Sequence, residues 1–274
     1  MNRLAILGYG NMGSAFAKAV RAAFPDVQLL VAEVDSSRAQ AAETEVSATT
    51  MMIDRLDQHD TVDVLADFYP DTVLFAVKPS HFPELAKAIK AHISDALILS
   101  LMAGVDLKTL EKHTGSDKIV RYLPNLAAGY GKSVTAVTPH PSLSTDQQAT
   151  AVAVAESAGI AVVLEERLIS SLIGISGSGI AFAFEFMHAL ALGGTQAGIA
   201  YPQSLEIAVA TLEGAAAAVR ESGINPAEFV TKVCSPGGTT INGIAALEQG
   251  NFTATVMQAV RSAEQRSREM ELES

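Results

Sequence analysis

The segment that decides the fold stands at the front of the chain, where residues 3–16 read RLAILGYGNMGSAF. Arg3 to Leu7 is a short apolar run of the kind that forms a buried strand, and Asn11 to Ala23 has the pattern of a helix. The turn between them has the spacing Gly-x-Gly-x-x-Gly. A strand, a glycine-rich turn and a helix in this order are typical of a dinucleotide-binding fold.

Each glycine of this turn has a physical task. Gly8 permits the tight turn, Gly10 lets the backbone approach a pyrophosphate, and Gly13 lets the helix pack closely on the strand. A bound anion would then lie on the free N–H groups at the helix N-terminus. A glycine-rich turn can also be purely structural, but its place at the head of an alternating pattern favours nucleotide binding.

Strands and helices alternate along the first half of the chain, which predicts crossover units and a parallel sheet. The expected strands are Val27–Ala32, Val73–Val77, Ala96–Leu101, Lys118–Tyr122, Ser133–Thr138 and Ala161–Leu164. The expected helices are Phe82–Ala91, Leu107–Lys112 and Thr145–Ser157. Thr49 to Asp67 is polar and gives no clear pattern.

After Glu165 the strand alternation ends and alanine-rich helical patterns follow one another. These are Ile180–Leu192, Gln203–Glu221, Pro226–Val233, Thr240–Gln249 and Phe252–Met270. The sequence therefore predicts an α/β fold with an N-terminal Rossmann-type parallel-sheet domain, residues 1–164, and an all-helical domain, residues 165–274.

Composition limits the classes of function. The chain has 274 residues, 49% of them hydrophobic, and a mean hydropathy of +0.25, which excludes disorder as the main state. A net charge of −11 repels a phosphate backbone and argues against a nucleic-acid partner. The lone Cys234 is consistent with a reducing compartment.

The most apolar stretch, Leu172 to Ile199, raises the question of a membrane span. Glu185 and His188 near its middle argue instead for a core helix, because an acidic residue at the centre of a bilayer costs about 3 kcal/mol. No targeting segment is visible at the front of the chain, so a cytoplasmic location is expected. The apolar helices from Ile180 to Val219 lack an obvious partner, which predicts a homodimer or a larger homo-oligomer.

A cluster of polar residues follows the second expected strand, where a dinucleotide-binding fold reads the ribose. Glu33 and Asp35 suit a free 2′-hydroxyl, while Ser36, Ser37 and Arg38 suit a 2′-phosphate. The sequence offers both, and a solvated loop is an equal alternative for any one of them.

Small or polar residues also follow three later strands. Ala76-Val77-Lys78-Pro79 is the first group, and Pro79 keeps Lys78 extended. Ser100 to Val105 and Arg121 to Asn125 are the other two. Because ligands collect at the carboxyl ends of parallel strands, the three groups together favour the lining of a cleft over a set of surface loops.

A second candidate anion site is Ser235-Pro236-Gly237-Gly238-Thr239-Thr240, which leads into a helix. Ser235 can cap, Pro236 suits a helix start, and the glycines expose backbone N–H groups. Such a loop is often only a connector, but two glycines followed by two threonines favour a site for a small anion. The six histidines show no spacing that pairs them as metal ligands, and no metal site is expected.

Taken together, these motifs resemble the pyrroline-5-carboxylate reductase family, the last enzymes of proline biosynthesis. The matching stretches are GYGNMGSA from Gly8, AVKP from Ala76, SLMAGV from Ser100, RYLPN from Arg121, GISGSG from Gly174 and SPGGTTINGIAALEQG from Ser235. The last is the most specific. The resemblance implies a Rossmann domain followed by a helical domain that interlocks with a partner subunit.

The 3-hydroxyacid dehydrogenases share this layout and are the natural rival. Gly174, Gly177 and Gly179 fit the opening of their motif, but Ala183 stands at the position of its lysine and Met187 at that of its asparagine. Alcohol oxidation needs such an acid–base group. Reduction of a protonated imine does not, because the imine already carries its proton.

The resemblance implies an oxidoreductase that reduces 1-pyrroline-5-carboxylate to L-proline with NADPH or NADH. Acids after the second strand are uncommon in the family, so either cofactor is expected. The implied cofactor contacts are Leu7, Gly8, Gly10, Asn11, Met12, Gly13, Glu33, Ser36, Ala76, Val77, Lys78, Pro79, Ala103 and Asn125. The implied substrate contacts are Ser235, Gly237, Gly238, Thr239 and Thr240, with the Thr240 hydroxyl near the ring nitrogen as the catalytic group. A nucleotide-binding regulatory protein that kept the fold and lost the reaction is the alternative.

Overall fold

The computed structural model describes residues 1–52 and 59–273, and the chain divides into two compact units. The sheet unit consists of residues 1–172 and 267–274, and the helical unit of residues 173–266. The predicted boundary lies between residues 164 and 165, whereas this division falls after residue 172 and assigns residues 267–274 to the sheet unit.

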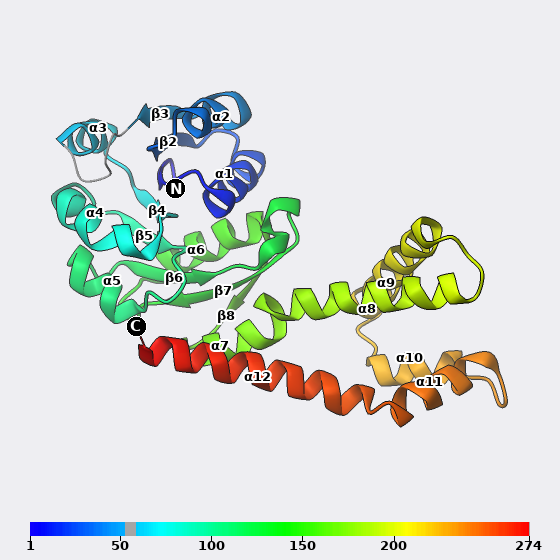
Figure 1. The fold of residues 1–274 in the computed structure, drawn as a ribbon. Coiled ribbons are helices and arrows are strands. Elements are labelled where there is room, and N and C mark those ends of the chain that lie inside the picture. The colour runs from blue at the N-terminus through cyan, green and yellow to red at the C-terminus, as the bar shows by residue number, and fades with distance from the viewer. Residues whose placement is uncertain (53–58, 274) are drawn as a thin grey trace. The chain divides into compact units, whose positions relative to one another are not determined.

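The sheet unit is built on eight strands in the order β3-β2-β1-β4-β5-β6-β7-β8. The strands are β1 Arg3–Leu7, β2 Gln28–Glu33, β3 Thr49–Met52, β4 Thr72–Phe75, β5 Leu97–Ser100, β6 Ile119–Leu123, β7 Ser133–Pro139 and β8 Gly159–Val163. The helices along them are α1 Asn11–Ala23, α2 Ser36–Val46, α3 His59–Phe68, α4 Phe82–Ile89, α5 Leu107–Thr114, α6 Thr145–Ser157 and α7 Ile169–Leu172. The predicted parallel sheet is confirmed for β1 to β6 (Figure 1).

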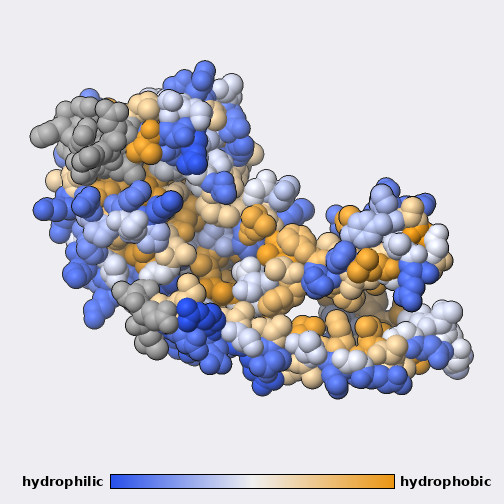
Figure 2. Space-filling model, in the orientation of Figure 1, coloured by the Kyte–Doolittle hydropathy of each residue, from blue (hydrophilic) through white to orange (hydrophobic). Residues whose placement is uncertain are grey.

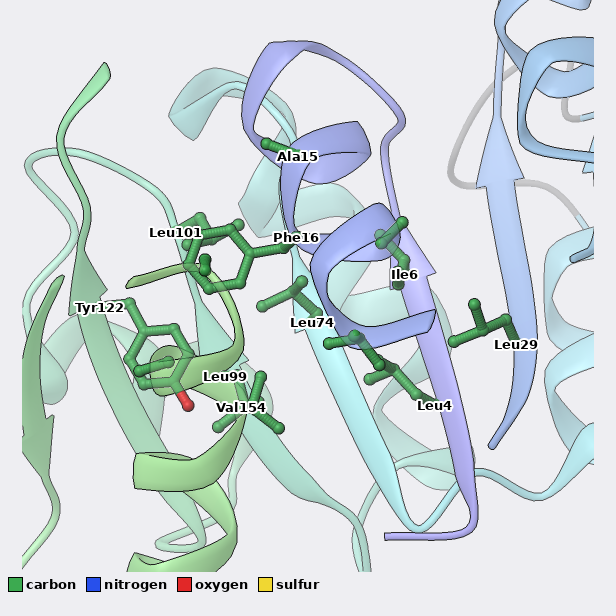
Figure 3. Packing of buried hydrophobic residues seen from close by; sticks show 14 of the residues in the cluster. Leu4, Ile6, Ala15, Phe16, Leu29, Leu74, Leu99, Leu101, Tyr122 and Val154 are labelled. Atoms are coloured by element: carbon green, nitrogen blue, oxygen red, sulfur yellow. The ribbon is translucent and has the colours of Figure 1, made fainter. Parts of the chain in front are cut away.

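Both faces of this sheet are buried over its central strands, whereas the edge strand β8 is partly exposed. Successive residues of β1 point to opposite faces, so Leu4 and Ile6 enter one core cluster while Ala5 and Leu7 enter the other. In the first cluster, α1 presents Phe16 to Tyr122 of β6, with their rings 6.1 Å apart (Figure 3). Burial on both faces explains why these strands read as continuous apolar runs in the sequence.

Two strands run against the prediction of a parallel sheet: β7 pairs antiparallel with β6, and β8 runs in the same direction as β7. Only residues 124–132 connect the two strands. A parallel crossover needs about a dozen residues or more, usually with a helix, so this connection can only turn the chain back. Strand β8 then pairs parallel with β7 after the crossover through α6.

Three further elements of the sheet unit lie where no regular structure was predicted: α2, β3 and α3. Helix α2 begins at Ser36 and strand β3 covers 49–52, while α3 covers the end of the polar stretch from Thr49 to Asp67. Residues 53–58 of that stretch lie outside the described residues. In α2 the buried positions are Ala39, Ala42 and Val46, and such small side chains give only a weak helical pattern.

The end of the chain is held to the sheet unit by a buried arginine. The Arg121 guanidinium lies 2.9 Å from a carboxylate oxygen of Glu166 and 3.4 Å from one of Glu271. Its side chain is only 4% exposed. The hydroxyl of Ser170 lies 3.1 Å from that of Ser267 beside this pair. The last turns of α12, Phe252–Glu273, therefore belong to the sheet unit although the rest of this helix does not.

The helical unit contains no strand among its described residues. It comprises the π-helical turn η5 Ile173–Gly177, α8 Gly179–Gln196, α9 Tyr201–Ser222, α10 Pro226–Val233, α11 Thr239–Gln249 and most of α12. A Cβ at Gly174 would lie 2.6 Å from the carbonyl oxygen of Val260, so this glycine permits a close approach to α12. The predicted succession of helices is confirmed.

Much of the apolar surface of the helical unit is exposed (Figure 2). An apolar groove of about 660 Å³ lies between α8, α11 and α12, lined among others by Phe182, Ala183, Phe186, Phe252 and Val256. The stretch Glu166–Gln196 is long and apolar enough to cross a membrane by length and composition, and 22% of its most apolar window is buried. An exposed apolar groove of this kind is typical of a surface that another protein chain covers.

Candidate functional site

The predicted cofactor residues lie at one edge of the sheet unit. Strands β1 to β6 are parallel, so their carboxyl ends meet at that edge. The strand order reverses at β1, which has β2 on one side and β4 on the other. Ligands of open α/β sheets bind at this switch point, and the glycine turn follows β1 directly.

The three glycines of the turn differ in what surrounds them. Gly8 has a φ of +99°, and a Cβ there would lie 2.8 Å from the carbonyl oxygen of Ala76. A Cβ at Gly13 would overlap the carbonyl oxygen of Gly8. A Cβ at Gly10 would meet no atom within 4 Å. Gly8 and Gly13 are thus required by the packing of the turn, whereas Gly10 leaves open space above it.

Helix α1 presents uncapped N–H groups to this open space. Gly10 is its N-cap residue, no side chain caps the helix, and its first turn contains no acidic residue. Asn11 and Met12 are the first helical residues, and Leu7 is the buried last residue of β1. A pyrophosphate fits such a terminus, because free N–H groups and the helix dipole both favour negative charge.

Residues 76–79 lie beside the turn, after β4 ends at Phe75. The Ala76 N–H donates to the carbonyl oxygen of Leu7 at 2.9 Å, which joins this loop to the end of β1. Lys78 is exposed and extended, with φ −64° and ψ 141°, and Pro79 begins a 3-10 turn. The predicted conformation of Lys78 is confirmed. Val77 is half-buried next to Gly8.

Two predicted contacts follow β5 and β6. Ala103 is exposed in the turn after β5, where Gly104 has a φ of +75°. Asn125 is 8% exposed, and its side-chain oxygen accepts hydrogen bonds from the N–H groups of Ala127 at 3.1 Å and Val134 at 3.4 Å. The Asn125 amide therefore fixes the loop after β6.

The polar cluster after β2 divides into buried and exposed parts. Glu33 is 4% exposed, and its carboxylate accepts hydrogen bonds from backbone N–H groups. The carboxylate of Asp35 caps α2 by accepting from the N–H groups of Ser37 and Arg38. This bonding, led by the hydroxyl of Ser37, lowers the pKa of Asp35. Ser36 is exposed at the first position of α2, so this cluster begins a helix rather than forming a loop.

The second predicted anion site lies in the helical unit, between α10 and α11. Helix α11 begins after Gly238, whose φ of −74° and ψ of 175° resemble the −74° and −166° of Gly10. No side chain caps α11 and no acid stands in its first turn. The Gly238 N–H donates to the carbonyl oxygen of Ser235 at 3.0 Å, which closes the turn. The expectation that Ser235 caps the helix is wrong, because the N-cap residue is Gly238.

The residues of this turn are accessible. Gly237 has a φ of +69°, which strongly favours glycine there. Thr239 and Thr240 are the first two residues of α11, and both are exposed. The turn therefore presents two threonine residues at an uncapped helix terminus.

Two features were not predicted from the sequence: the contacts of Tyr9 that hold the glycine turn and the ion pairs of Arg121. The Tyr9 side chain is buried and its hydroxyl donates to Glu45 at 3.0 Å. Arg121, which was expected with the cleft-lining strand ends, is instead the buried ion-pair partner of Glu166 and Glu271. A tyrosine between two glycines and an arginine inside an apolar strand were the available signals.

Among residues 1–52 and 59–273, no group of three or more His, Cys, Asp or Glu side chains lies close enough together to hold a metal ion. Ala183, at the position of the rival family's lysine, lines the apolar groove.

Comparison with known proteins covers both halves of the chain. The family model described as pyrroline-5-carboxylate reductase dimerisation matches residues 166–270, and the model described as NADP oxidoreductase coenzyme F420-dependent matches residues 3–104. The pyrroline-5-carboxylate reductase of Aquifex aeolicus is 37% identical over 98% of this chain and 97% of its own length.

Solved structures agree with the sequence comparison. A pyrroline-5-carboxylate reductase from Coxiella burnetii has a TM-score of 0.88 at 26% identity, covering 97% of both chains. The enzyme from Streptococcus pyogenes has a TM-score of 0.80 at 28% identity, covering 97% of this chain and 98% of its own. With near-complete coverage of both units and all the motifs above in order, the chain belongs to the pyrroline-5-carboxylate reductase family.

Proposed function

We propose that this chain reduces 1-pyrroline-5-carboxylate to L-proline with NADPH or NADH, as a homo-oligomer in the cytoplasm. The observation that carries the proposal is the 37% identity over 98% of the chain to a pyrroline-5-carboxylate reductase. The alignment covers both units, each of which contains one of the two helix termini described above.

The cofactor site proposed for the sheet unit centres on the turn from Gly8 to Gly13. Its uncapped N–H groups would hold the pyrophosphate, and the match of residues 3–104 to an NADP oxidoreductase model supports this assignment. Residues 76–79, Ala103 and Asn125 would border the nicotinamide half, and Ser36 the adenosine ribose. When bound, the reduced nicotinamide supplies the hydride.

The substrate site proposed for the helical unit is the turn from Ser235 to Thr240. The N–H groups and hydroxyl groups there would hold the carboxylate of the cyclic imine, and the Thr240 hydroxyl would steady the ring nitrogen. A protonated imine carries its own proton, so its reduction does not need an acid–base residue at position 183, where this chain has alanine. Catalysis would then rest on orientation, which can supply about 7–11 kcal/mol.

The proposed assembly is a dimer, or a larger oligomer based on it, formed through residues 165–274. The dimerisation model matches residues 166–270, and the exposed groove beside Phe186 and Val256 needs a covering surface. A second copy of the helical unit supplies apolar side chains of the same kind. This would also explain how the apolar stretch Glu166–Gln196 is shielded from water.

The test is an assay of the purified chain with 1-pyrroline-5-carboxylate and each reduced cofactor in turn. We expect imine-dependent loss of the absorbance of the reduced nicotinamide, and L-proline as the product. Proline-dependent reduction of the oxidised cofactor at alkaline pH provides the reverse measurement. A regulatory protein that only binds nucleotide would show cofactor binding and neither reaction, and that result would contradict the proposal.

A further inference from the structure

We propose that Glu33 is a positioning residue that fixes the glycine turn through the Tyr9 N–H and does not read the cofactor's ribose. The inference rests on the proposed cofactor site. It concerns a residue that the sequence pattern alone assigns to ribose recognition, because an acid at the end of β2 is the usual partner of a free 2′-hydroxyl.

Both carboxylate oxygens of Glu33 accept hydrogen bonds from backbone N–H groups. Oε2 accepts the Tyr9 N–H at 2.6 Å. Oε1 accepts the N–H groups of Val34 at 2.8 Å and Asp35 at 3.1 Å. With 4% of the residue exposed, these three donors replace the water that an ionised carboxylate would otherwise bind. Three of the roughly four acceptor positions of the carboxylate are thus occupied by backbone, and its burial leaves little access for a ribose hydroxyl.

The shortest of these three hydrogen bonds comes from the N–H of a residue inside the glycine turn. Tyr9 lies between Gly8 and Gly10 and is 3% exposed. Its N–H is held by Glu33 and its hydroxyl by Glu45, which also pairs with Lys18 at 3.0 Å. Burial raises the pKa of the Tyr9 hydroxyl, and the bond to Glu45 raises it further, so this group remains a neutral donor. The turn is therefore anchored to β2 and to α2 through one residue.

The two anchors differ in strength. The bond from Tyr9 N–H to Glu33 is buried and charge-assisted, which makes it one of the stronger hydrogen-bond types. Lys18 and Glu45 have side chains that are 52% and 40% exposed, so their ion pair adds little. Loss of the Glu33 bond should therefore displace the turn more than loss of the Glu45 bond.

The affinities for the two cofactors distinguish a positioning role of Glu33 from a role in binding the ribose. The turn contacts the pyrophosphate, which NADH and NADPH share, so a displaced turn weakens both cofactors by the same factor. A residue that accepts from the 2′-hydroxyl would instead affect NADH alone, since NADPH carries a phosphate there. The ratio of the two affinities thus separates a positioning residue from a ribose ligand.

The experiment compares wild type with Glu33→Gln by calorimetric titration with NAD⁺ and with NADP⁺. Glutamine keeps the size of the side chain, but its amide group cannot accept hydrogen bonds at both ends. We expect both dissociation constants to rise about tenfold, the effect of losing one charge-assisted hydrogen bond, with their ratio unchanged. A loss confined to NAD⁺, or no loss for either cofactor, would overturn the proposal.

Amide hydrogen exchange without any cofactor gives an independent readout. We expect faster exchange across residues 8–13 in Glu33→Gln than in wild type, because the Tyr9 N–H loses its acceptor. Ser144→Ala is the matched control, since it removes the side-chain cap of α6 and lowers stability without touching the turn. Its cofactor affinities and its exchange over residues 8–13 should equal those of wild type.

Tyr9→Phe keeps the proposal testable if Glu33→Gln does not fold. It removes the anchor to Glu45 and leaves the backbone bond to Glu33, so we expect a smaller and again equal loss of both affinities. A selective loss of NAD⁺ affinity would count against the proposal. Imine reduction is assayed separately: a wild-type chain that binds both cofactors but reduces no imine contradicts the proposed function and leaves the Glu33 comparison valid.

Discussion

At the scale of single residues, the three glycines of the turn from Gly8 to Gly13 differ in the physical reason for the missing side chain. Gly13 is required because a side chain there would overlap the backbone of Gly8, and Gly8 because its φ is +99°. Gly10 has an ordinary φ of −74° and open space around it. Only the third case points to an external ligand, since nothing within the chain accounts for the missing side chain.

The first prediction follows from this contrast. Gly10→Ala should leave the free energy of unfolding within about 0.5 kcal/mol of wild type, because the methyl group meets no atom of the chain. It should weaken NADP⁺ binding at least about tenfold, because the methyl group stands where the pyrophosphate approaches. Urea denaturation and calorimetric titration measure the two effects.

Gly13→Ala is the counterpart for the same measurements. It should lower the free energy of unfolding by about 1–3 kcal/mol through overpacking against Gly8. If Gly10→Ala proved as destabilising as Gly13→Ala, the open space above the turn would be a wrong description of the folded protein.

The second prediction concerns Thr240. Removal of its hydroxyl by Thr240→Ala should lower kcat by about tenfold, the effect of one lost hydrogen bond to the reacting ring. Thr240→Ser keeps the hydroxyl and should retain most of the activity. Steady-state rates that are the same for alanine and for wild type would remove Thr240 from the mechanism.

At the scale of elements, the helices differ in whether a side chain caps their N-terminal N–H groups. Asp35, Asp106 and Ser144 cap α2, α5 and α6. Helices α1 and α11 begin on Gly10 and Gly238 with no side-chain cap. N–H groups that a side chain has satisfied cannot bind a ligand, so the absence of a cap at these two termini suits anion binding.

The third prediction uses the cap of α5. The Asp106 carboxylate accepts from the Thr109 N–H at 2.7 Å. Burial acts to raise the pKa of Asp106, but hydrogen bonds from Thr109 and the charges of Arg121 and Lys108 outweigh it, and the pKa is lowered. A lowered pKa in the folded state means that the stabilisation is present above the unfolded value of about 4 and is lost as the pH falls through the folded value.

Asp106→Ala should therefore lower the free energy of unfolding by about 1 kcal/mol near neutral pH. The difference from wild type should shrink as the pH is lowered below about 4. Urea denaturation across that range measures it. A difference that stayed constant down to about pH 2 would show that the ionised cap is not its source.

At the scale of the whole molecule, the two units differ in how much of their apolar side-chain surface is buried. The sheet unit buries both faces of its central strands, and the end of α12 packs with it at Arg121. The helical unit leaves large apolar side chains exposed, among them Phe184, Val256 and Met257. A monomer would present this surface to water, and association through it removes that cost.

The fourth prediction tests this association. Val256 is 41% exposed and lines the apolar groove, so Val256→Asp would place a charge in the proposed interface. We expect the sedimentation coefficient to fall to that of a monomer, and imine reduction to fall with it. Ala149→Asp puts the same charge at an exposed position of α6 and should leave the assembly unchanged. An oligomer that survived Val256→Asp would place the interface elsewhere.

The sequence by itself determined the strand, glycine turn and helix at the front of the chain, the alternation that makes a parallel sheet, and the succession of helices that follows. These features are local: strand and helix periodicity, the missing Cβ of glycine and the restricted φ of proline act within a few residues. They sufficed to place the glycine turn after β1 and the second glycine-rich turn before α11.

Only the tertiary structure decided which partners the polar residues take. Glu33 and Tyr9 are 24 positions apart in the sequence, and Arg121 and Glu271 are 150 apart. No local pattern distinguishes a carboxylate that will face a ribose from one that will be enclosed by backbone N–H groups. The choice depends on which groups the folded chain brings together away from water, where an unsatisfied charge is most costly.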